Sequence, residues 1–392
     1  MSTTLPPLVE PAAELTREEI ARYSRHLIIP DLGVEGQKRL KNARVLVIGA
    51  GGLGAPALLY LAAAGVGTIG IVDDDVVDES NLQRQIIHGV SDIGRPKGES
   101  ARDSIAEINP LVQVRVHPVR LRPHNAVDLF EQYDLIVDGT DNFATRYLVN
   151  DAAVLAGKPY VWGSIYRFEG QVSVFWEDAP GGIGLNYRDL YPEPPPPGLV
   201  PSCAEGGVLG ILCASIASVM GTEAIKLITG IGEPLLGRLL IYDALEMSYR
   251  TIAIRKDPST PKITELVDYE QFCGVVSDEA ADAVADSTIT PRELRELLDS
   301  GKKLALIDVR EPAEWEINHI DGAQLIPHSQ INSGEGLAKL PQDRMPVLYC
   351  KTGVRSAEAL AALKRAGFAD AVHLQGGIVA WAKQIQPDMV MY

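Results

Sequence analysis

The stretch from Val45 to Val72 constrains the fold most, because it contains no charged residue and many glycines. It starts within an apolar strand-like run, Arg44 to Ile48, and passes through the turn Gly49 to Gly54 into a helix of small residues, Ala55 to Ala64. A second strand-like run, Thr68 to Val72, follows. The stretch is long enough to cross a bilayer, but its glycines interrupt any membrane helix. A strand, turn, helix and strand of a buried parallel sheet explain it better.

Later segments repeat this alternation. Leu135 to Val137 is a further apolar strand that runs into Asp138 to Asn142, and Val208 to Thr229 is typical of a long core helix. We expect Leu239 to Tyr242 and Ser248 to Arg255 to be the last strands of this part. Alternating strands and helices predict an α/β, Rossmann-like doubly wound sheet that binds ligands at the carboxyl ends of its strands.

The length of the chain predicts two domains, because 392 residues exceed one ordinary core. The acidic, alanine-rich stretch 276–287 is the best candidate for a linker. It separates residues 1–275 from a small α/β domain, 288–392. In this second domain we expect a helix from Thr288 to Ser300 and a strand from Leu304 to Val309.

Charge and cysteine content argue against several classes of protein. The net charge of −16 disfavours nonspecific binding to nucleic acid or to an anionic membrane. The N-terminal residues lack the basic and apolar regions of a signal peptide. The four cysteines lack close pairing, which indicates a reducing cytoplasm without a disulfide framework. They are Cys203, Cys213, Cys273 and Cys350; we expect Cys213 to be a core residue and Cys273 to be structural.

The turn after the first strand has the spacing of a nucleotide-binding loop. Its glycines, Gly49, Gly51, Gly52 and Gly54, let backbone N–H groups approach phosphate oxygens, and the helix dipole favours negative charge. Asp73 ends the second strand near the spacing of an acid that binds a ribose. Nicotinamide and flavin enzymes share this pattern, so the loop alone leaves a redox enzyme open.

Polar and basic residues beyond the loop favour cleavage of a triphosphate instead. Asn81, Arg84 and Lys97 follow the second strand closely. A redox dinucleotide site does not need arginine and lysine on its phosphates, whereas a triphosphate being cleaved does, because charge builds on the leaving pyrophosphate. Asp141 follows another strand and suits Mg²⁺, a hard cation that prefers carboxylates.

As a set, these motifs resemble the ubiquitin-activating-enzyme-like adenylyltransferases, the MoeB/ThiF family, over roughly residues 15–275. The motifs that carry the resemblance are Arg22 to His26, Gly49 to Gly54, Asp73 with Asp75, Ser80 to Gln85, Lys97 and Asp138 to Asn142. The resemblance implies ATP and Mg²⁺ as cofactors. The ATP site that it implies comprises Gly49, Gly51, Gly52, Gly54, Asp73, Asp75, Ser80, Asn81, Leu82, Gln83, Arg84, Lys97, Asp141 and Asn142.

The resemblance also implies a role for individual residues. Asp73 would hold the ribose, Asn81, Arg84 and Lys97 would contact phosphates, and Asp141 would position Mg²⁺. Taken singly, each basic residue could instead be an ordinary surface charge, and only their joint occurrence favours the site.

The same resemblance implies a substrate and an assembly. Arg25 would reach into the site of a partner subunit, which implies a homodimer. The C-terminal carboxylate of a ubiquitin-like sulfur carrier ending in Gly-Gly, of the MoaD, ThiS or CysO type, would attack the α-phosphate. The products would be an acyl-adenylate and pyrophosphate.

One departure from the family concerns its zinc. Many members hold zinc with two CxxC pairs, which would fall near Tyr187 to Leu190 and Asp257 to Lys262, and neither stretch contains cysteine. Zinc is therefore not expected, and packing should hold the segment. Cys203 stands where relatives carry a cysteine that in some members accepts an acyl or sulfur group. That role and a dispensable loop cysteine both remain open.

A reactive sulfur site is predicted near the C-terminus. The strand Met345 to Tyr349 ends at Cys350, a glycine-containing loop follows, and a helix, Ser356 to Arg365, starts at once. This geometry directs backbone N–H groups and a helix N-terminus at one sulfur, with Lys351 and Arg355 beside it. Such surroundings stabilise a thiolate or persulfide anion.

Residues 288–392 resemble a single rhodanese domain. Three motifs carry the resemblance: Asp308 to Trp315, His319 to Ala323 and Cys350 to Arg355. It implies that Cys350 takes sulfane sulfur from thiosulfate or from another protein's persulfide, and that Lys351 and Arg355 favour an anionic donor.

Cysteine-dependent phosphatases use a similar loop, with five residues between cysteine and arginine. This chain has four, which leaves a smaller cradle suited to sulfur. We interpret Asp308 as structural, bonded to loop backbone, and His319 as a residue of the fold motif.

The order of the two domains predicts one pathway. The carrier is adenylated, the persulfide of Cys350 displaces AMP, and reductive cleavage leaves a thiocarboxylate. The resemblance implies molybdopterin synthesis, with cysteine synthesis as a second use. One alternative is an adenylating enzyme whose rhodanese domain only docks or regulates. Another is a Rossmann redox enzyme with a sulfur-handling tail.

Overall fold

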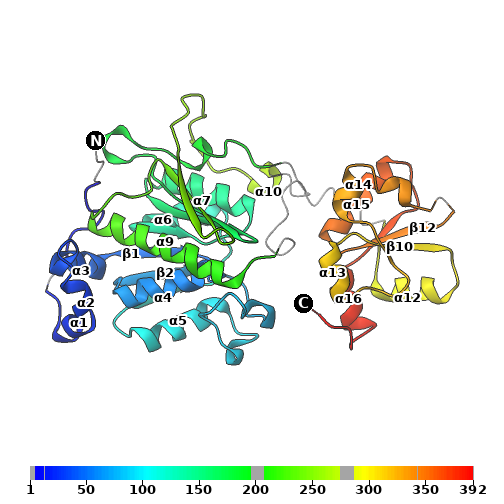
Figure 1. The fold of residues 1–392 in the computed structure, drawn as a ribbon, viewed down its shortest axis with the longest axis horizontal. Helices are drawn as coiled ribbons and strands as arrows, with labels where there is room; N and C mark the ends of the chain where they lie inside the picture. The colour runs from blue at the N-terminus through cyan, green and yellow to red at the C-terminus, as the bar shows by residue number, and fades with distance from the viewer. Residues whose placement is uncertain (1–4, 13, 196–206, 274–286, 342, 392) are drawn as a thin grey trace. The chain divides into compact units, whose positions relative to one another are not determined.

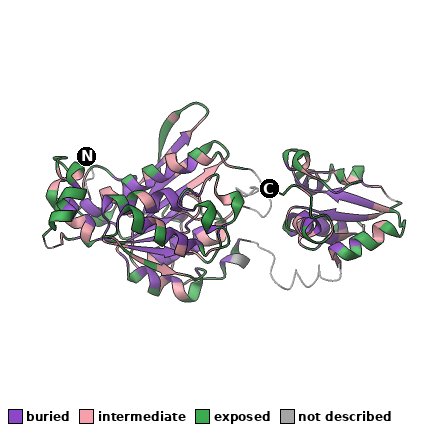
Figure 2. Ribbon diagram, turned by 90° about the horizontal axis from the view of Figure 1, so that it is seen from below, coloured by how far each residue is buried: buried purple, intermediate pink, exposed green. Residues whose placement is uncertain are grey.

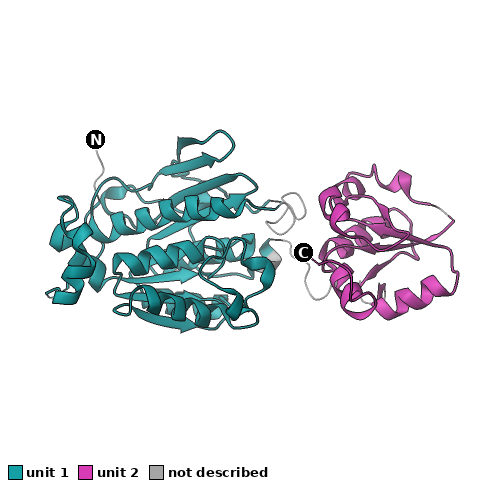
Figure 3. Cartoon of the chain, turned by 60° about the horizontal axis from the view of Figure 1, so that its bottom comes forward, with its two compact units in different colours: residues 1–195, 201–273 teal, residues 196–200, 274–392 magenta. Residues whose placement is uncertain are grey.

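The structure, a computed structural model, describes residues 5–12, 14–195, 207–273, 287–341 and 343–391. These residues form two compact units, one ending at Cys273 and one beginning beyond it (Figure 3). The expected boundaries 1–275 and 288–392 stay a prediction. The expected linker, 276–287, lies outside the described residues except for Ser287.

The first unit is built on an eight-stranded sheet with the order β3-β2-β1-β4-β5-β6-β7-β8. Strands β3, β2, β1, β4 and β5 run parallel, and β6, β7 and β8 continue the sheet antiparallel. The strands are β1 (Arg44–Ile48), β2 (Thr68–Val72), β3 (Gln113–His117), β4 (Leu135–Asp138), β5 (Tyr160–Tyr166), β6 (Glu169–Phe175), β7 (Arg238–Asp243) and β8 (Ser248–Ala253). The doubly wound α/β prediction is confirmed, with an antiparallel extension.

Helices cover both faces of this sheet (Figure 1). The helices of this unit are α1 (Arg17–Arg22), α2 (Ser24–Leu27), α3 (Gly33–Asn42), α4 (Gly54–Ala64), α5 (Lys97–Ile108), α6 (Pro123–Glu131), α7 (Phe143–Leu155), α9 (Gly210–Thr229) and α10 (Tyr269–Phe272). Val45 and Val47 of β1 join the core beneath α4, α5 and α9, whereas Leu46 and Ile48 join the core beneath α6 and α7. Both sides of the central strands are therefore buried (Figure 2), which explains their uncharged sequence.

Short 3-10 helices connect several of these elements. They are η1 (Glu79–Asn81), η2 (Val90–Asp92), η3 (Pro180–Gly182) and η4 (Tyr187–Asp189) in the first unit and η5 (Leu337–Lys339) in the second. At the N-terminal side, Thr16 and Glu19 form a reciprocal capping box, which satisfies two backbone N–H groups at the start of α1.

Helix α9 has the length and hydropathy of a membrane span, and within the described chain it alone does. It packs against α4 and against strands β5 and β6, with Leu212, Ile216 and Met220 in the core. Its role as the core helix predicted from Val208 to Thr229 is confirmed, with a start at Gly210.

A lysine joins the two stretches in which the resemblance would place cysteine pairs. Lys256 Nζ lies 3.2 Å from a carboxylate oxygen of Asp189 in η4 and 2.6 Å from one of Glu177. The N–H of Asp257 donates to the second oxygen of Asp189 at 3.1 Å, and Asn186 donates to Glu177 at 2.7 Å. An ammonium group thus links the two segments by ion pairing, and packing alone, as expected from the sequence, is not the full account.

Replacing Lys256 with methionine should lower the free energy of unfolding of the first unit by about 1–2 kcal/mol. The Asp189 side chain is fully buried and would lose its cationic partner. Burial favours the neutral form of Glu177, but hydrogen bonds from Lys256 and Asn186 hold its pKa below its ordinary value. Urea denaturation measures the change, with the exposed Lys262→Met as matched control; equal effects of the two substitutions would contradict it.

The second unit is a five-stranded parallel sheet with the order β11-β10-β12-β13-β9. Its elements are β9 (Thr288–Ile289), α12 (Pro291–Asp299), β10 (Leu304–Asp308), α13 (Pro312–Ile317), β11 (Gln324–Leu325), α14 (His328–Asn332), β12 (Met345–Tyr349), α15 (Val354–Arg365), β13 (Val372–Leu374) and α16 (Gly377–Gln384). The helix expected from Thr288 to Ser300 is wrong at its start. Thr288 and Ile289 pair with β13, and the helix begins after the capping box of Thr290 and Glu293.

Candidate active sites

The glycine-rich turn between β1 and α4 presents free backbone donors at the carboxyl edge of the sheet. The N–H groups of Gly51 and Gly52 have no hydrogen-bond partner among the described residues. A Cβ on Gly54 would lie 1.8 Å from the carbonyl oxygen of Gly49, so only glycine lets α4 start this close to the turn. A loop of free N–H groups at a helix N-terminus can bind phosphate.

Asp73 fastens this loop to the end of β2. One of its carboxylate oxygens accepts a hydrogen bond from the N–H of Ala50 at 2.7 Å, and the other accepts from the N–H of Asp75 at 2.9 Å. Burial raises the pKa of Asp73, and these two hydrogen bonds oppose that rise. Asp73 therefore lies where the sequence predicts a carboxylate that binds ribose, and it also orders the loop.

The predicted phosphate contacts converge on the same edge. The stem of Arg84 lies beside the loop, 3.8 Å from the position of a Cβ on Gly52, and its Nη1 donates to the carbonyl of Ser80. Lys97 begins α5 and is buried, with Nζ 2.9 Å from a carboxylate oxygen of Asp75. The carboxylate of Asp75 thus holds the ammonium that was predicted to contact phosphate.

The remaining residues of the SNLQRQ motif shape this wall of the site. Asn81 accepts from the N–H of Asp78 at 3.1 Å and closes the turn η1. Leu82 is half-buried, and Gln83 packs against the start of α9 at Gly210. Gln85 was not predicted as a site residue, although it is buried beside Gly51 and its Oε1 finds no partner within the described structure. Its position next to Arg84 was the available signal.

Asp141 and Asn142 lie in the turn after β4. Asp141 is exposed, and Asn142 caps α7 by accepting from the N–H of Thr145 at 2.8 Å. The turn packs against the phosphate loop, because Gly139 approaches Gly54 closely. Asp141 is therefore free to ligate Mg²⁺ next to phosphates, a role that stays a prediction.

Asp138 orders this turn from inside the protein. It is fully buried, and its Oδ1 accepts from the N–H of Thr140 at 3.0 Å and from its hydroxyl at 2.7 Å. Its Oδ2 has no partner among the described residues, and burial raises the pKa of Asp138 to about 6. Sequence reasoning quoted Asp138 only as part of a motif and missed this role.

Replacing Asp138 with asparagine should stabilise the first unit at neutral pH. The folded pKa lies above the ordinary 3.8, so this group's stabilisation is present below pH 4 and is lost as pH rises through 6. The loss is at most about 3 kcal/mol, and asparagine keeps the acceptor for Thr140. Urea denaturation between pH 4 and 8 measures it, with exposed Asp141→Asn as control; a less stable Asp138→Asn variant at pH 7.5 would contradict the prediction.

Two predicted residues are not brought into this site. Arg25 is exposed on α2, and its predicted reach into a partner subunit stays a prediction. Cys203 lies outside the described residues. Cys213 is buried in the core, as predicted. Cys273, which was predicted to be structural, is buried as well, and burial raises its pKa to about 11. The described residues contain no cluster of three or more metal-ligating side chains.

The second candidate site is the loop that follows β12. Cys350 is 1% exposed, and its Sγ accepts a hydrogen bond from the N–H of Gly353 at 3.1 Å. The N–H groups of Ile378 and Val379, in the first turn of α16, donate to the loop carbonyls of Cys350 and Lys351 at 2.9 and 3.2 Å. With its carbonyls held by α16, the loop directs the N–H of Gly353 toward the sulfur.

The structure changes the predicted role of Arg355. Its guanidinium donates to both carboxylate oxygens of Glu314, at 2.7 and 2.9 Å, and both side chains are buried. Arg355 therefore fixes the start of α15 to α13 and does not present a free charge to a sulfur donor. Lys351 is half-buried in the loop itself.

Asp308 accepts a hydrogen bond from loop backbone, as predicted, and it also binds a guanidinium group that was not predicted. Asp308 is fully buried and pairs with Arg310, which donates from its backbone N–H and its guanidinium. His319 stacks on Trp315 with ring centroids 4.0 Å apart. Within the described part of the unit, no hydrogen bond joins either side chain to Cys350.

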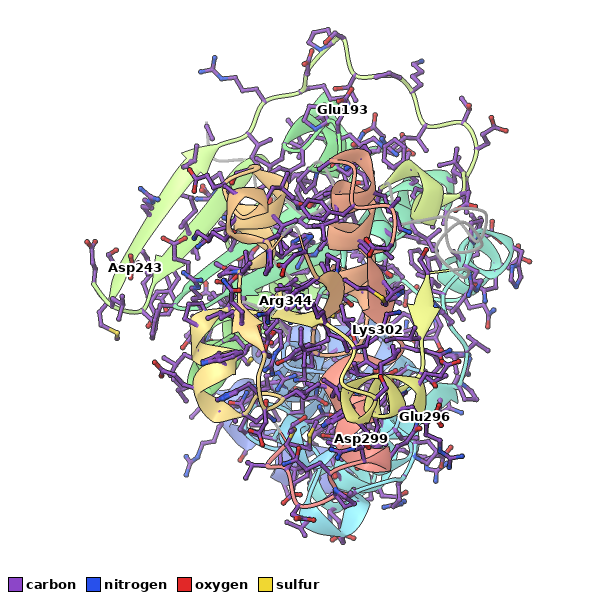
Figure 4. The ribbon with its side chains drawn as sticks, turned by 90° about the vertical axis from the view of Figure 1, so that its right-hand side faces the viewer. Glu193, Asp243, Glu296, Asp299, Lys302 and Arg344 are labelled. Atoms are coloured by element: carbon purple, nitrogen blue, oxygen red, sulfur yellow. The ribbon has the colours of Figure 1, made fainter. Side chains whose placement is uncertain are left out.

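A hollow of about 440 Å³ lies elsewhere in the second unit. It is lined by Lys302, Lys303 and Arg344, with Asp343 and Asp370 among their neighbours; Lys302 and Arg344 are labelled in Figure 4. These residues precede or lie near the amino ends of β10 and β12, whereas Cys350 follows the carboxyl end of β12. The hollow is therefore separate from the sulfur site.

A glycine-rich turn in a doubly wound sheet and a cysteine loop in a small parallel sheet define the class of protein. Residues 23–262 match the ThiF family, and residues 290–384 match the rhodanese-like domain. The chain belongs to the ThiF family and carries a rhodanese-like domain.

Relatives of known name agree with this assignment. The probable adenylyltransferase/sulfurtransferase MoeZ of Mycobacterium tuberculosis is 86% identical over 392 residues, covering 100% of both chains. An adenylyltransferase and sulfurtransferase of Drosophila grimshawi is 41% identical over 97% of this chain and 87% of its own. The sulfur carrier protein adenylyltransferase of Thermus thermophilus is 54% identical over 66% of this chain and 98% of its own. The protein is thus a transferase enzyme with adenylyltransferase and sulfurtransferase domains.

Solved structures support the fold of the first unit. A crystal structure of E. coli MccB superimposes with a TM-score of 0.53 at 21% identity, covering 65% of this chain and 73% of that chain. At this identity the likeness concerns the fold alone.

Proposed function

We propose that the first unit adenylates the C-terminal carboxylate of a ubiquitin-like sulfur carrier that ends in Gly-Gly. Members of the ThiF family use ATP, and the free N–H groups of Gly51 and Gly52 beside Arg84 and Lys97 suit its phosphates. The carboxylate oxygen attacks the α-phosphorus, the bond to the β-phosphate oxygen breaks, and pyrophosphate leaves. Positive charge beside the phosphates stabilises that leaving group.

Asp141 is the proposed Mg²⁺ ligand of this site. Its exposed carboxylate lies in a turn that packs on the phosphate loop, and carboxylate oxygen is the donor that Mg²⁺ prefers. Bound Mg²⁺ would neutralise phosphate charge. Asp138, by fixing Thr140, sets the backbone on which Asp141 stands.

The second unit supplies the sulfur in this proposal. The thiolate of Cys350 attacks the outer sulfur of thiosulfate, sulfite leaves, and Cys350 becomes a persulfide. The terminal persulfide sulfur attacks the acyl-adenylate, AMP leaves, and an acyl disulfide forms. A dithiol reductant supplies two electrons that break the S–S bond, giving the carrier thiocarboxylate and the free thiol of Cys350. The N–H of Gly353, 3.1 Å from Sγ, supports the anionic sulfur.

The observation that carries the proposal is the presence of both complete sites in one chain. Each loop keeps its reactive geometry: free donors at the phosphate turn and an N–H directed at the sulfur of Cys350. The test is the intact mass of a Gly-Gly-ended carrier after incubation with the protein, Mg-ATP, thiosulfate and a dithiol. We expect a gain equal to the exchange of one oxygen for sulfur.

The main alternative is an adenylating enzyme whose rhodanese-like domain only docks or regulates. Pyrophosphate release without any gain in carrier mass would favour it. A functional rhodanese domain should instead convert cyanide and thiosulfate into thiocyanate and sulfite. The hydrogen-bonded sulfur of Cys350 supports the active form, because a docking module has no need of an oriented thiol.

Three further parts of the proposal concern the setting of the reaction. We propose molybdopterin synthesis as the use of the thiocarboxylate, with cysteine synthesis as a second use. A homodimer would let Arg25, exposed on α2, reach the partner's phosphates. The scarcity of cysteines fits a cytoplasmic enzyme. Size measurement in solution and the mass assay repeated with each carrier class test these points.

A further inference from the structure

One histidine supports the phosphate loop from inside the first unit. His88 is buried, with its Nε2 3.0 Å from the carbonyl oxygen of Ala50 and its Nδ1 2.8 Å from the hydroxyl of Ser100. A carbonyl oxygen can only accept, so Nε2 carries the hydrogen that is donated to Ala50. Burial lowers the pKa of His88, which keeps the ring neutral at neutral pH.

This hydrogen bond fixes the direction of a donor that the site needs. The carbonyl of Ala50 and the N–H of Gly51 belong to one planar trans peptide, in which they point in opposite directions. Holding the carbonyl on His88 turns the Gly51 N–H away from the protein interior. That N–H has no partner within the described residues, so it is available to a ligand.

The peptide on the other side of Ala50 is fixed as well. The N–H of Ala50 donates to Asp73 at 2.7 Å, so both peptide groups that flank Ala50 are held by side chains. Gly51 has no Cβ, and without the hydrogen bond from His88 its preceding peptide could rotate. A rotated peptide would present a carbonyl oxygen to the phosphates in place of an N–H, and the two would repel each other.

His88 also connects the loop to the helix that carries Lys97. Ser100 lies one turn after Lys97 in α5, and its hydroxyl contacts the imidazole. The two groups proposed to meet the phosphates, the loop N–H groups and Lys97, thus belong to segments that are connected through His88 and Ser100. Within the described residues, no hydrogen bond joins His88 to the Nζ of Lys97 or to the loop N–H groups.

We propose that His88 is a positioning residue for ATP: its Nε2–H fixes the Ala50–Gly51 peptide so that the Gly51 N–H faces the phosphates. The inference rests on the proposed adenylation site. The proposed role differs from a purely structural one because ATP binding should depend on a hydrogen-bond donor at the Nε2 position and not on the imidazole ring itself.

Two substitutions separate these roles in the full-length protein. Gln places an amide N–H₂ near the Nε2 position and can still donate to Ala50, whereas Asn reaches only the Nδ1 position. Calorimetric titration with Mg-ATP should show His88→Gln within about threefold of the wild type. His88→Asn should bind roughly tenfold or more weakly, since a misaimed donor costs this much or more. Thiocyanate formation at Cys350, in the other unit, should be unchanged in both.

Several outcomes would overturn the inference. The inference fails if the His88→Asn and His88→Gln variants bind Mg-ATP with equal affinity, whether that affinity is weak or normal in both. Hydrogen exchange of the wild type supplies a test that needs no variant: Mg-ATP should slow exchange in the peptide that contains Gly51, and unchanged exchange would also overturn it. A wild type that fails to bind Mg-ATP would instead remove the proposed adenylation site itself. Weak binding by Arg84→Ala with normal binding by His88→Asn would leave that site intact and remove only the role of His88.

Discussion

Replacing Cys350 with alanine should abolish the formation of carrier thiocarboxylate while pyrophosphate release continues. Alanine has no sulfur to hold as a persulfide, and a thiolate is the nucleophile that the loop is built to orient. The loss in thiocarboxylate formation and in thiocyanate formation should be roughly a thousandfold or more. Both losses follow from removal of the Cys350 sulfur. Pyrophosphate release continues because the glycine-rich turn that is proposed to bind phosphate belongs to the other unit.

The matched control is Cys203→Ala. If Cys203 is a dispensable loop cysteine, the Cys203→Ala variant keeps full thiocarboxylate formation. If Cys203 accepts the acyl or sulfur group, this variant loses thiocarboxylate formation, as the Cys350→Ala variant does. The mass of the carrier, followed over time, is the measurement. A Cys350→Ala protein that still thiolates its carrier would contradict the proposed mechanism.

Replacing Arg84 with alanine should produce the opposite pattern. The stem of Arg84 lies beside Gly52 and its guanidinium donates to Ser80, so loss of the side chain removes positive charge near the proposed position of the leaving pyrophosphate. We expect pyrophosphate release with a carrier to fall roughly a hundredfold. Thiocyanate formation at Cys350 should be unchanged, which also verifies that the variant protein is folded in its second unit.

A control for this charge is Arg102→Ala. Arg102 carries the same positive charge as Arg84, but it faces solvent on α5, where it pairs with Glu99 and Asp103. Removing it changes the net charge equally and should leave pyrophosphate release within about twofold, as is usual for an exposed ion pair. A similar loss in the two variants would mean that Arg84 acts only through the overall field of the protein.

The parts of the fold that follow from local pattern were predictable. Strands β1, β2 and β12 have the predicted bounds, because each is a continuous apolar run ended by glycine, aspartate or cysteine. Strands β5 and β6 were not predicted individually, since they carry polar residues and glycines. Strand β6 also pairs with β7, in which Asp243 lies opposite Glu169, far away in the sequence. Such pairing depends on the whole sheet and leaves no local pattern.

The candidate sites divide in the same way. Motif spacing located the phosphate loop and Cys350, because backbone geometry at a strand end is a local property. The contacts of side chains were not predictable from spacing. Arg355 reaches Glu314, 41 positions away, and His88 reaches Ala50, 38 positions away. The burial that determines their partners arises only when helices pack on the sheet.

The ion pairs of Lys256 have a consequence for sulfur chemistry. A zinc site of two CxxC pairs would place four thiolates in the chain that carries the persulfide, and thiolates attack sulfane sulfur. Lys256, Glu177 and Asp189 hold the same segments with groups that sulfur does not attack. The two other cysteines in the described part of the chain are buried, and Cys273 stays protonated at neutral pH. The sulfane sulfur proposed for Cys350 therefore has few thiols in the described chain that could accept it in place of the carrier.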